Sequence, residues 1–254
     1  MPSKKKPLQL LFDADMLCFE SCAAVEEEIH WGDGLWTLHA DANVAQAKID
    51  SMVKTLTMKV LDKLNYEGQY DIIMCFSDSV NFRKRLYPLY KANRIGKRKP
   101  VCYSGVVDWC KQEYTTYQRD TLEADDCLGI LSTMNPGNAV IISGDKDFKS
   151  IPGFFFDYRR GEFHEIDLED ADKAHLYQTL IGDTADNYPG CPGVGEKTAE
   201  KLFLEKGVEW GTVVGAFEKK GLTEEDALLQ ARVARILRKE DYNFKTKEPI
   251  LWNP

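Results

Sequence analysis

The sequence lacks the features that mark membrane, secreted and zinc proteins. No run approaches the roughly 18 consecutive apolar residues that a membrane helix needs. The apolar stretch after the N-terminal lysines meets Asp13 within a few residues, too early for a signal peptide. The four histidines form no HExxH or HxxxH pattern, which argues against a histidine-based zinc centre. We therefore expect a cytoplasmic protein, in the host cytoplasm if a phage encodes it, with no membrane partner.

Cysteine is present without an obvious pairing. The seven cysteines are an odd number and are scattered along the chain. Cys18 and Cys22 stand four apart, and no second pair follows at zinc-like spacing. Free cysteines commonly pack as small hydrophobic residues. We expect reduced thiols in the interior.

The overall composition is that of an ordinary globular protein. The chain has 254 residues, of which 43% are hydrophobic and 29% are charged. These values exclude a disordered, collagen-like or coiled-coil chain. The length suits one large domain or two small ones, and no internal repeat or low-complexity linker divides it.

Charge is segregated along the chain. The net charge is −8, from 41 acidic and 33 basic residues, which argues against an indiscriminate nucleic-acid coat. Residues 82–100, the basic segment, nevertheless carry no acid and include Arg83, Lys84, Arg85, Lys91, Arg94, Lys97, Arg98 and Lys99. Phe82, Tyr87 and Tyr90 are interleaved with these cations, a combination suited to phosphates and unpaired bases. Prolines and a glycine make one unbroken helix unlikely here, and a solvated loop is the alternative.

The hydrophobic pattern predicts an α/β fold. Short apolar runs indicate buried strands at 8–12, 70–76 and 138–143, with a Tyr/Thr-rich strand at 114–119. Helical patterns alternate with them at 41–66, 104–113 and 123–134, and dominate later at 173–182, 195–206, 208–219 and 223–240. Continuous apolar strands favour a parallel sheet covered on both faces. We predict an α/β core over 1–170 and a helical part over 171–254, packed together as one unit.

Acidic residues stand where the predicted strands end. The candidates are Asp13, Asp78, Glu123, Asp125, Asp126, Asp145, Asp147, Asp183 and Asp186. Any one of them alone suits a helix cap, a turn or a surface charge. The carboxyl ends of parallel strands meet at one edge, where ligands bind in open α/β sheets. Carboxylates gathered there repel unless hard cations neutralise them, and oxygen-only ligation favours Mg²⁺ or Mn²⁺. Two such ions about 4 Å apart stabilise both oxygens of a phosphodiester displacement.

A glycine-rich turn follows the last acidic pair. Residues 187–199 read NYPGCPGVGEKTA, so Gly193 and Gly195 precede a helical run. Glycines at a helix N-terminus let a phosphate or an ion approach the backbone N–H groups, and Lys197 and Thr198 would add side-chain contacts. The alternative is an ordinary turn between two helices.

The ordered set of motifs resembles the flap endonuclease/5′→3′ exonuclease family. The matching blocks are LLFDAD (10–15), FSDSVNFRKRLYPLYKANR (76–94), LEADD (122–126), ISGDKDF (142–148) and GDTADNYPGCPGVGEKTA (182–199). FSDSVNFRK and ARILRKEDYNF are most similar to the short stand-alone exonucleases of podovirus-type phages. The resemblance implies a PIN-like sheet, with a helix–hairpin–helix motif at about 173–206.

The resemblance also implies roles for the residues. The nine acids above would hold two Mg²⁺ or Mn²⁺ ions, with Asp15 as a further candidate beside Asp13. Lys91 and Arg94 would contact the scissile phosphate. The hairpin would grip duplex DNA and often binds K⁺ in this family. The remaining predicted DNA contacts are Arg83, Lys84, Arg85, Tyr90, Lys97, Arg98, Lys99, Gly193, Gly195, Lys197 and Thr198. The basic segment is short, which leaves open a closed arch or an open ramp.

The expected function is metal-dependent hydrolysis of DNA from 5′ ends. Duplex and 5′-flap DNA are the expected substrates, RNA–DNA hybrids are possible ones, and a monomer is the expected state. Two alternatives remain at this point. Asp13-Ala-Asp15 after an apolar strand resembles the opening motif of haloacid-dehalogenase-type phosphatases, but that reading leaves the basic segment unexplained. A non-catalytic protein that binds DNA structures would keep the acids for architecture alone.

Overall fold

A six-stranded sheet lies at the centre of the protein. The structure is a computed structural model that describes residues 6–254, so the first five residues of the expected core lie outside it. The strand order is β5-β4-β1-β6-β7-β8. The strands are β1 (Leu8–Asp13), β4 (Tyr70–Cys75), β5 (Thr115–Tyr117), β6 (Ala139–Ser143), β7 (Gly153–Asp157) and β8 (Glu162–Ile166). All neighbours pair in parallel except β8, which is antiparallel to β7.

The predicted parallel sheet is confirmed, and β1, β4, β5 and β6 lie where strands were predicted. β1 lies between β4 and β6, and Phe12 is paired with Met74 on one side and Ile142 on the other. This register brings the carboxyl ends of β1 and β6 to the same edge. The strands β7 and β8 were not predicted. β8 is an edge strand with mixed polar and apolar residues, which is a weak sequence signal.

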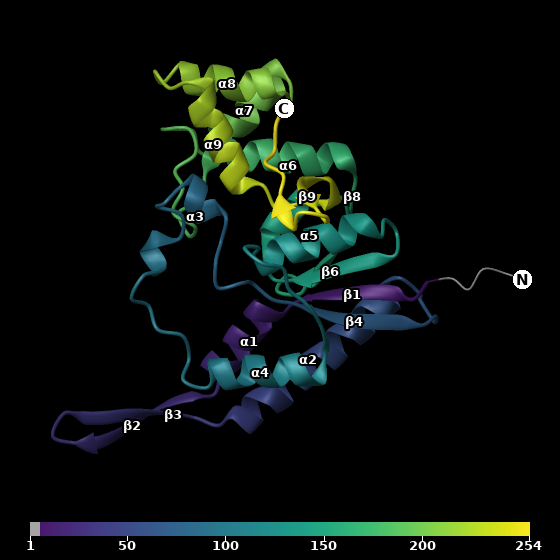
Figure 1. Ribbon diagram of the computed structural model, residues 1–254, viewed down its shortest axis with the longest axis vertical. Coiled ribbons are helices and arrows are strands. Elements are labelled where there is room, and N and C mark those ends of the chain that lie inside the picture. Colours follow the sequence, from purple (N-terminus) through teal and green to yellow (C-terminus); the bar gives the residue numbers. More distant parts are fainter. Residues whose placement is uncertain (1–5) are drawn as a thin grey trace, which may run out of the picture.

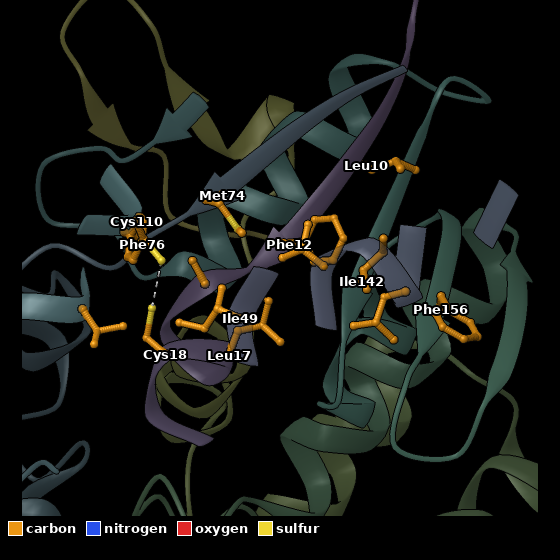
Figure 2. Packing of buried hydrophobic residues seen from close by; sticks show 14 of the residues in the cluster. Leu10, Phe12, Leu17, Cys18, Ile49, Met74, Phe76, Cys110, Ile142 and Phe156 are labelled. Atoms are coloured by element: carbon orange, nitrogen blue, oxygen red, sulfur yellow. Dashed lines mark hydrogen bonds between the residues drawn. The ribbon is translucent and has the colours of Figure 1, made fainter. Parts of the chain in front are cut away.

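Three helices cover one face of the sheet: α1 (Ala14–Ala23), α2 (Ala42–Lys63) and α4 (Tyr103–Glu113). Figure 2 shows Leu17 of α1 and Ile49 of α2 packed with Phe12 and Met74 of the sheet. Burying each such side chain contributes about 1.5–3 kcal/mol. The thiols of Cys18 and Cys110 lie 3.7 Å apart in this core (Figure 2). All seven cysteines are free thiols and all but the half-buried Cys102 are buried, as expected.

The other face is covered by α5 (Ala124–Met134) and by the end of the chain. Ile236, Leu237 and Tyr242 pack with Leu11 of β1 in a second core. The approach is close at Gly129, where an added Cβ would lie 2.4 Å from the Leu237 carbonyl oxygen. The C-terminal segment, with η3 (Lys239–Asp241), β9 (Tyr242–Asn243) and β10 (Glu248–Pro249), therefore returns from the helical part to the sheet.

The helical part lies beyond α5 (Figure 1). It consists of α6 (Leu168–Ile181), α7 (Glu196–Lys206), α8 (Trp210–Glu218) and α9 (Glu224–Ala234), packed around a third core. α6 begins a few residues before the expected boundary. α9 ends at Ala234 instead of 240 because Arg235 turns to an extended conformation and donates to Asp241. None of the helices in residues 6–254 is long and apolar enough to span a membrane.

A two-stranded hairpin projects from the body between α1 and α2 (Figure 1). It comprises β2 (Glu26–Gly32) and β3 (Leu35–Ala40), paired antiparallel, with Trp31 and Trp36 exposed. The sequence analysis predicted neither this hairpin nor α1. The hairpin begins with three consecutive glutamates, which are depleted in strands.

Candidate active site

The ends of β1 and β6 deliver the first carboxylates. Asp13 is the last residue of β1 and is 4% exposed. Its oxygens accept hydrogen bonds from the Met16 N–H at 3.1 Å and the Ser143 hydroxyl at 2.8 Å. Asp145 follows β6 and accepts from the Asp147 N–H at 2.9 Å, so the turn after the strand is fixed by these side chains. Neighbouring parallel strands thus place Asp13, Asp145 and Asp147 at one edge, as predicted.

The N-terminus of α5 adds two more acids. Glu123 is the N-cap residue, in an extended conformation, and Asp125 lies in the first turn. Burial raises the pKa of Asp125 most, and repulsion from Asp13 raises it more than any other charge does. Asp125 therefore faces the strand ends, although regular helical geometry left its direction open.

A tight loop between α6 and α7 brings in the last two acids. The backbones of Asp183 and Tyr188 exchange hydrogen bonds of 2.8 and 3.0 Å across it. Gly182 and Gly190, both with positive φ, approach so closely that a Cβ on Gly190 would lie 2.3 Å from the Gly182 nitrogen. This closure turns Asp183 and Asp186 back toward the sheet.

The pKa values show that these carboxylates share one crowded region. Burial, with repulsion from Asp15 and Asp145, raises the pKa of Asp13 to about 7. Burial, with repulsion from Asp145 and Asp183, raises the pKa of Asp147 to about 7. The acid cluster, as we call it, therefore comprises Asp13, Glu123, Asp125, Asp145, Asp147, Asp183 and Asp186. Its charge is costly unless cations compensate it.

The basic segment lies along the edge of the acid cluster. It forms α3 (Arg83–Leu86) and η1 (Ala92–Arg94) and otherwise runs as a loop down to α4, so the predicted break in helix is confirmed (Figure 1). The Lys91 ammonium contacts Glu123 and lies 3.4 Å from Asp186, while Arg94 donates to Asp186 at 2.5 Å. Burial opposes ionisation of Glu123, but the charges of Lys91 and Arg83 lower its pKa to about 2.

Lys91 is held in an unusual backbone conformation. Its φ of 55° and ψ of 21° lie in the left-handed region, which costs a non-glycine residue about 1–2 kcal/mol. Its N–H donates to the Asp186 carbonyl at 2.8 Å. The Tyr90 hydroxyl contacts Glu123 at 2.8 Å and Asp186 at 2.9 Å. These contacts join the basic segment, the core and the α6–α7 loop at one point.

Two residues expected at the site belong to the interior. Arg83 is 2% exposed and Asp126 is fully buried. Both nitrogens of the guanidinium fork donate to Asp126 at 2.7 Å, and the arginine also donates to the carbonyls of Val233 and Arg235. Asp126 accepts two further backbone N–H groups, from Glu123 and Leu237. Because these atoms are occupied and sealed from solvent, Arg83 is not a surface contact for DNA and Asp126 is not an open ligand.

Asp78 and Asp15 make structural contacts near the site. The N–H of Thr121, followed by that of Ser79, lowers the pKa of Asp78, which ties the turn after β4 to the loop before α5. Asp15 accepts from the Ser77 N–H at 2.9 Å and the Tyr103 hydroxyl at 3.2 Å. The predicted metal role of Asp78 is therefore less favoured than those of the acid cluster.

The acid cluster has the donor chemistry of a site for hard divalent cations. All its side-chain donors are carboxylate oxygens, and burial together with repulsion between the acids raises the pKa values of Asp13, Asp125 and Asp147. Within the described part of the chain, no three acidic, histidine or cysteine side chains are arranged to hold one ion as they stand. Carboxylate oxygens are the ligands that the expected cations prefer. The side chains would have to rotate to surround one ion.

Two residues that support the site, Ser143 and Gln178, were not predicted from the sequence. Ser143 donates to Asp13, and Gln178 of α6 donates to Asp147 at 3.0 Å. Ser143 ends a buried strand beside Gly-Asp, so its position was a usable signal. Gln178 lies 31 residues from Asp147, and no local pattern connects them.

Further predicted DNA-binding residues lie on the surface of the protein. Lys84, Arg85, Lys97, Arg98 and Lys99 are exposed, although Arg98 also pairs with Glu26 at 2.6 Å. Gly193, Gly195, Lys197 and Thr198 are exposed together at the start of α7. The Lys220 ammonium would lie 3.4 Å from a Cβ on Gly193, so it adds a cation that the sequence did not indicate. The predicted DNA-binding roles of these residues stay predictions.

Comparison with known proteins agrees with this arrangement. The family model described as "5′-3′ exonuclease, N-terminal resolvase-like domain" matches residues 10–152. The exonuclease of Escherichia phage T7 is 34% identical over 96% of this chain and 93% of its own length. The exodeoxyribonuclease of Enterobacteria phage T3 is 33% identical over 96% and 92%.

The fold also matches a solved structure. The structure of T5 5′-exonuclease with bound zinc aligns with a TM-score of 0.64 at 17% identity, covering 90% of this chain and 89% of that one. The matches argue against the phosphatase alternative and against a non-catalytic protein, because the similar proteins are nucleases. From the family model and the identity to the phage enzymes, we conclude that the chain belongs to the 5′–3′ exonuclease family.

Proposed function

We propose that this protein hydrolyses DNA phosphodiesters from 5′ ends, as a metal-dependent 5′→3′ exonuclease that also cuts 5′ flaps. The observation that carries the proposal is the acid cluster at the carboxyl edge of the sheet, bordered by Lys91 and Arg94. Carboxylates paired with cations at the border of the cluster suit a reaction in which metal ions and a phosphate share one site.

The acid cluster would hold two divalent ions, Mg²⁺ or Mn²⁺. When bound, they would activate water and stabilise charge on the attacking and leaving oxygens. Asp13, Asp125, Asp145 and Asp147 are best placed to ligate them, because they lie together at the strand ends. Glu123, Asp183 and Asp186 complete the set from the other side, where Lys91 and Arg94 now compensate their charge.

Lys91 and Arg94 would bind the phosphoryl oxygens of the scissile group. Their charged ends already lie over the acids, so they need only rotate toward an arriving phosphate. The loop at Gly193 to Thr198 would hold duplex DNA by its backbone as part of a helix–hairpin–helix motif, with K⁺ as a candidate ion. Specificity would then follow DNA structure and ends rather than sequence, and products would carry 5′-phosphates.

We further propose a monomer in the cytoplasm of the host cell that accepts duplex, 5′-flap and RNA–DNA hybrid substrates. The basic segment supports an open ramp, because only the short helical turn η1 interrupts the loop between α3 and α4. A single strand passing along it would meet Lys97, Arg98 and Lys99.

The test is cleavage of an internally labelled linear duplex and a matching 5′-flap substrate, with magnesium and with EDTA. Asp145→Asn keeps the shape of the side chain and removes its charge. The surface variant Asp108→Asn on α4 is the matched control. We expect magnesium-dependent release of short products by the wild type and the control, and loss of cleavage with retained DNA binding in Asp145→Asn.

Product lengths separate exonuclease action from flap cutting. Wild-type turnover by Asp145→Asn would remove that residue from the site. Absence of cleavage by folded wild-type protein on both substrates would refute the proposed function.

A further inference from the structure

A small pocket beside the acid cluster is rich in cations that the proposed chemistry does not use. It has a volume of about 170 Å³ and lies between η2 (Lys146–Ser150), α6 and the turn after β7. Its polar lining includes Lys146, Lys149, Arg160, Ser150 and Gln178. Three basic residues therefore line one hollow.

The cations of the pocket outnumber its acids, because three basic residues line it together with one carboxylate, that of Asp147. Lys146, Lys149 and Arg160 are exposed. Over residues 6–254, neither lysine takes part in an ion pair. Arg160 makes one weak contact, 3.4 Å from Asp157. A pocket with this excess of positive charge is suited to an anion that carries more than one acceptor oxygen.

The pocket is directly joined to the acid cluster. Asp147 lines it, and Gln178, another lining residue, donates to the Asp147 Oδ2 at 3.0 Å. The pocket also shares Lys149 and Tyr177 with a larger hollow of about 960 Å³ between α6, α7 and β8. An anion in the pocket would therefore lie one side chain from the reacting region and have space beyond it for attached groups.

We propose that this pocket binds a phosphate of the nucleic-acid strand, separate from the scissile one, through Lys149 and Arg160 with Lys146. The inference deepens the proposed function and rests on it for the identity of the strand. The phosphate is either the terminal 5′-phosphate or an internal phosphodiester next to the cleaved bond. Both present phosphate oxygens that the cations recognise. A 5′-hydroxyl substrate contains the internal phosphodiester and lacks the terminal phosphate.

The test uses the double variant Lys149→Ala/Arg160→Gln, which alters two exposed side chains outside the acid cluster. Lys149→Arg keeps the charge, and Lys59→Ala on α2 removes an exposed lysine far from the site. Affinity for 5′-phosphorylated and 5′-hydroxyl duplexes is measured in EDTA by fluorescence anisotropy. KM and kcat are measured with magnesium, and circular dichroism checks the fold of each variant.

We expect the double variant to bind roughly tenfold more weakly and to raise KM by a similar factor, with kcat within about twofold of wild type. Lys149→Arg and Lys59→Ala should behave as wild type. Weakening on 5′-phosphorylated DNA alone assigns the pocket to the terminal phosphate, and equal weakening on both substrates assigns it to an internal one.

If the double variant binds both substrates with wild-type affinity and cleaves them with wild-type KM, the proposed phosphate site is refuted. The proposed function is unaffected by that result. The reverse result is also distinguishable. A wild type that cleaves no DNA, but binds it more tightly than the double variant does, would refute the function and keep the phosphate site.

Discussion

The start and the middle of the basic segment place similar ion pairs in opposite surroundings. At the start, Arg83 and Asp126 are buried, and every oxygen of the carboxylate is occupied. Eight and eleven residues later, Lys91 and Arg94 contact Glu123 and Asp186 at the border of the acid cluster, where the arginine is 52% exposed. The first group joins the core to the end of α9, and the second keeps charges that can turn toward a ligand.

The difference lies in what surrounds each pair. Arg83 donates to backbone carbonyls as well as to Asp126, so its removal leaves several buried groups without partners. Lys91 balances carboxylates that repel one another, and a divalent cation would do the same. In the structural ion pair, hydrogen bonds within the protein thus occupy the polar atoms of both side chains. In the functional ion pair, a ligand can take the place of either partner.

The largest expected effect on stability comes from breaking the buried ion pair between Arg83 and Asp126. Arg83→Met should lower the free energy of unfolding by about 3–5 kcal/mol, because Asp126 remains buried without its partner. Urea denaturation followed by circular dichroism measures this, with Arg85→Met, an exposed neighbour, as the control. A change below about 1 kcal/mol would show that the Arg83 pair is as dispensable as a surface one.

Lys91→Ala should instead affect the reaction. We expect kcat to fall about 10²–10³-fold at saturating DNA, in line with loss of a group that stabilises transition-state charge. The free energy of unfolding should change far less than in Arg83→Met. Single-turnover cleavage and DNA binding are measured together. A loss of DNA affinity without a fall in the cleavage rate would show that Lys91 only contacts the DNA backbone.

Asp147→Asn tests the repulsion within the acid cluster. The pKa of Asp147 is raised from 3.8 to about 7, so ionisation disfavours the folded state as pH rises through this range. Without metal, the variant should gain stability over wild type by up to about 1.4 kcal/mol per pH unit between pH 4 and 7, with no further gain above.

Paired urea denaturation curves from pH 5 to 8 measure this difference. His175, whose pKa burial lowers to about 3, titrates identically in both proteins and cancels. Added magnesium should stabilise the wild type more than the variant. A pH-independent difference between them would contradict the crowding of charge around Asp147.

The smallest effect is expected where the basic segment is most exposed. Lys97→Gln with Lys99→Gln should weaken DNA binding only a few-fold and reduce the salt dependence of log Kd by about one for each lost phosphate contact. Anisotropy titrations at several salt concentrations measure both. An unchanged salt slope would place the DNA away from this stretch.

Local patterns in the sequence determined four of the six strands of the sheet and part of the acid cluster. An apolar run that ends at Asp13 defines β1, and one that Gly144-Asp145 follows defines β6. Parallel pairing puts the carboxyl ends of both strands at one edge, so the placement of Asp13, Asp145 and Asp147 follows from local pattern. The resemblance to a nuclease family rested on the same residues, and the comparisons confirm it.

Only the tertiary structure distinguished Arg83 and Asp126 from their neighbours. Neither residue type nor sequence spacing distinguishes a buried ion pair from an exposed one. Burial depends on where α9 and the C-terminal segment pack, more than 100 residues away. The same holds for Gln178 beside Asp147 and for the cationic pocket between η2 and α6. Periodicity reports the local direction of a side chain, whereas its partners are set by long-range packing.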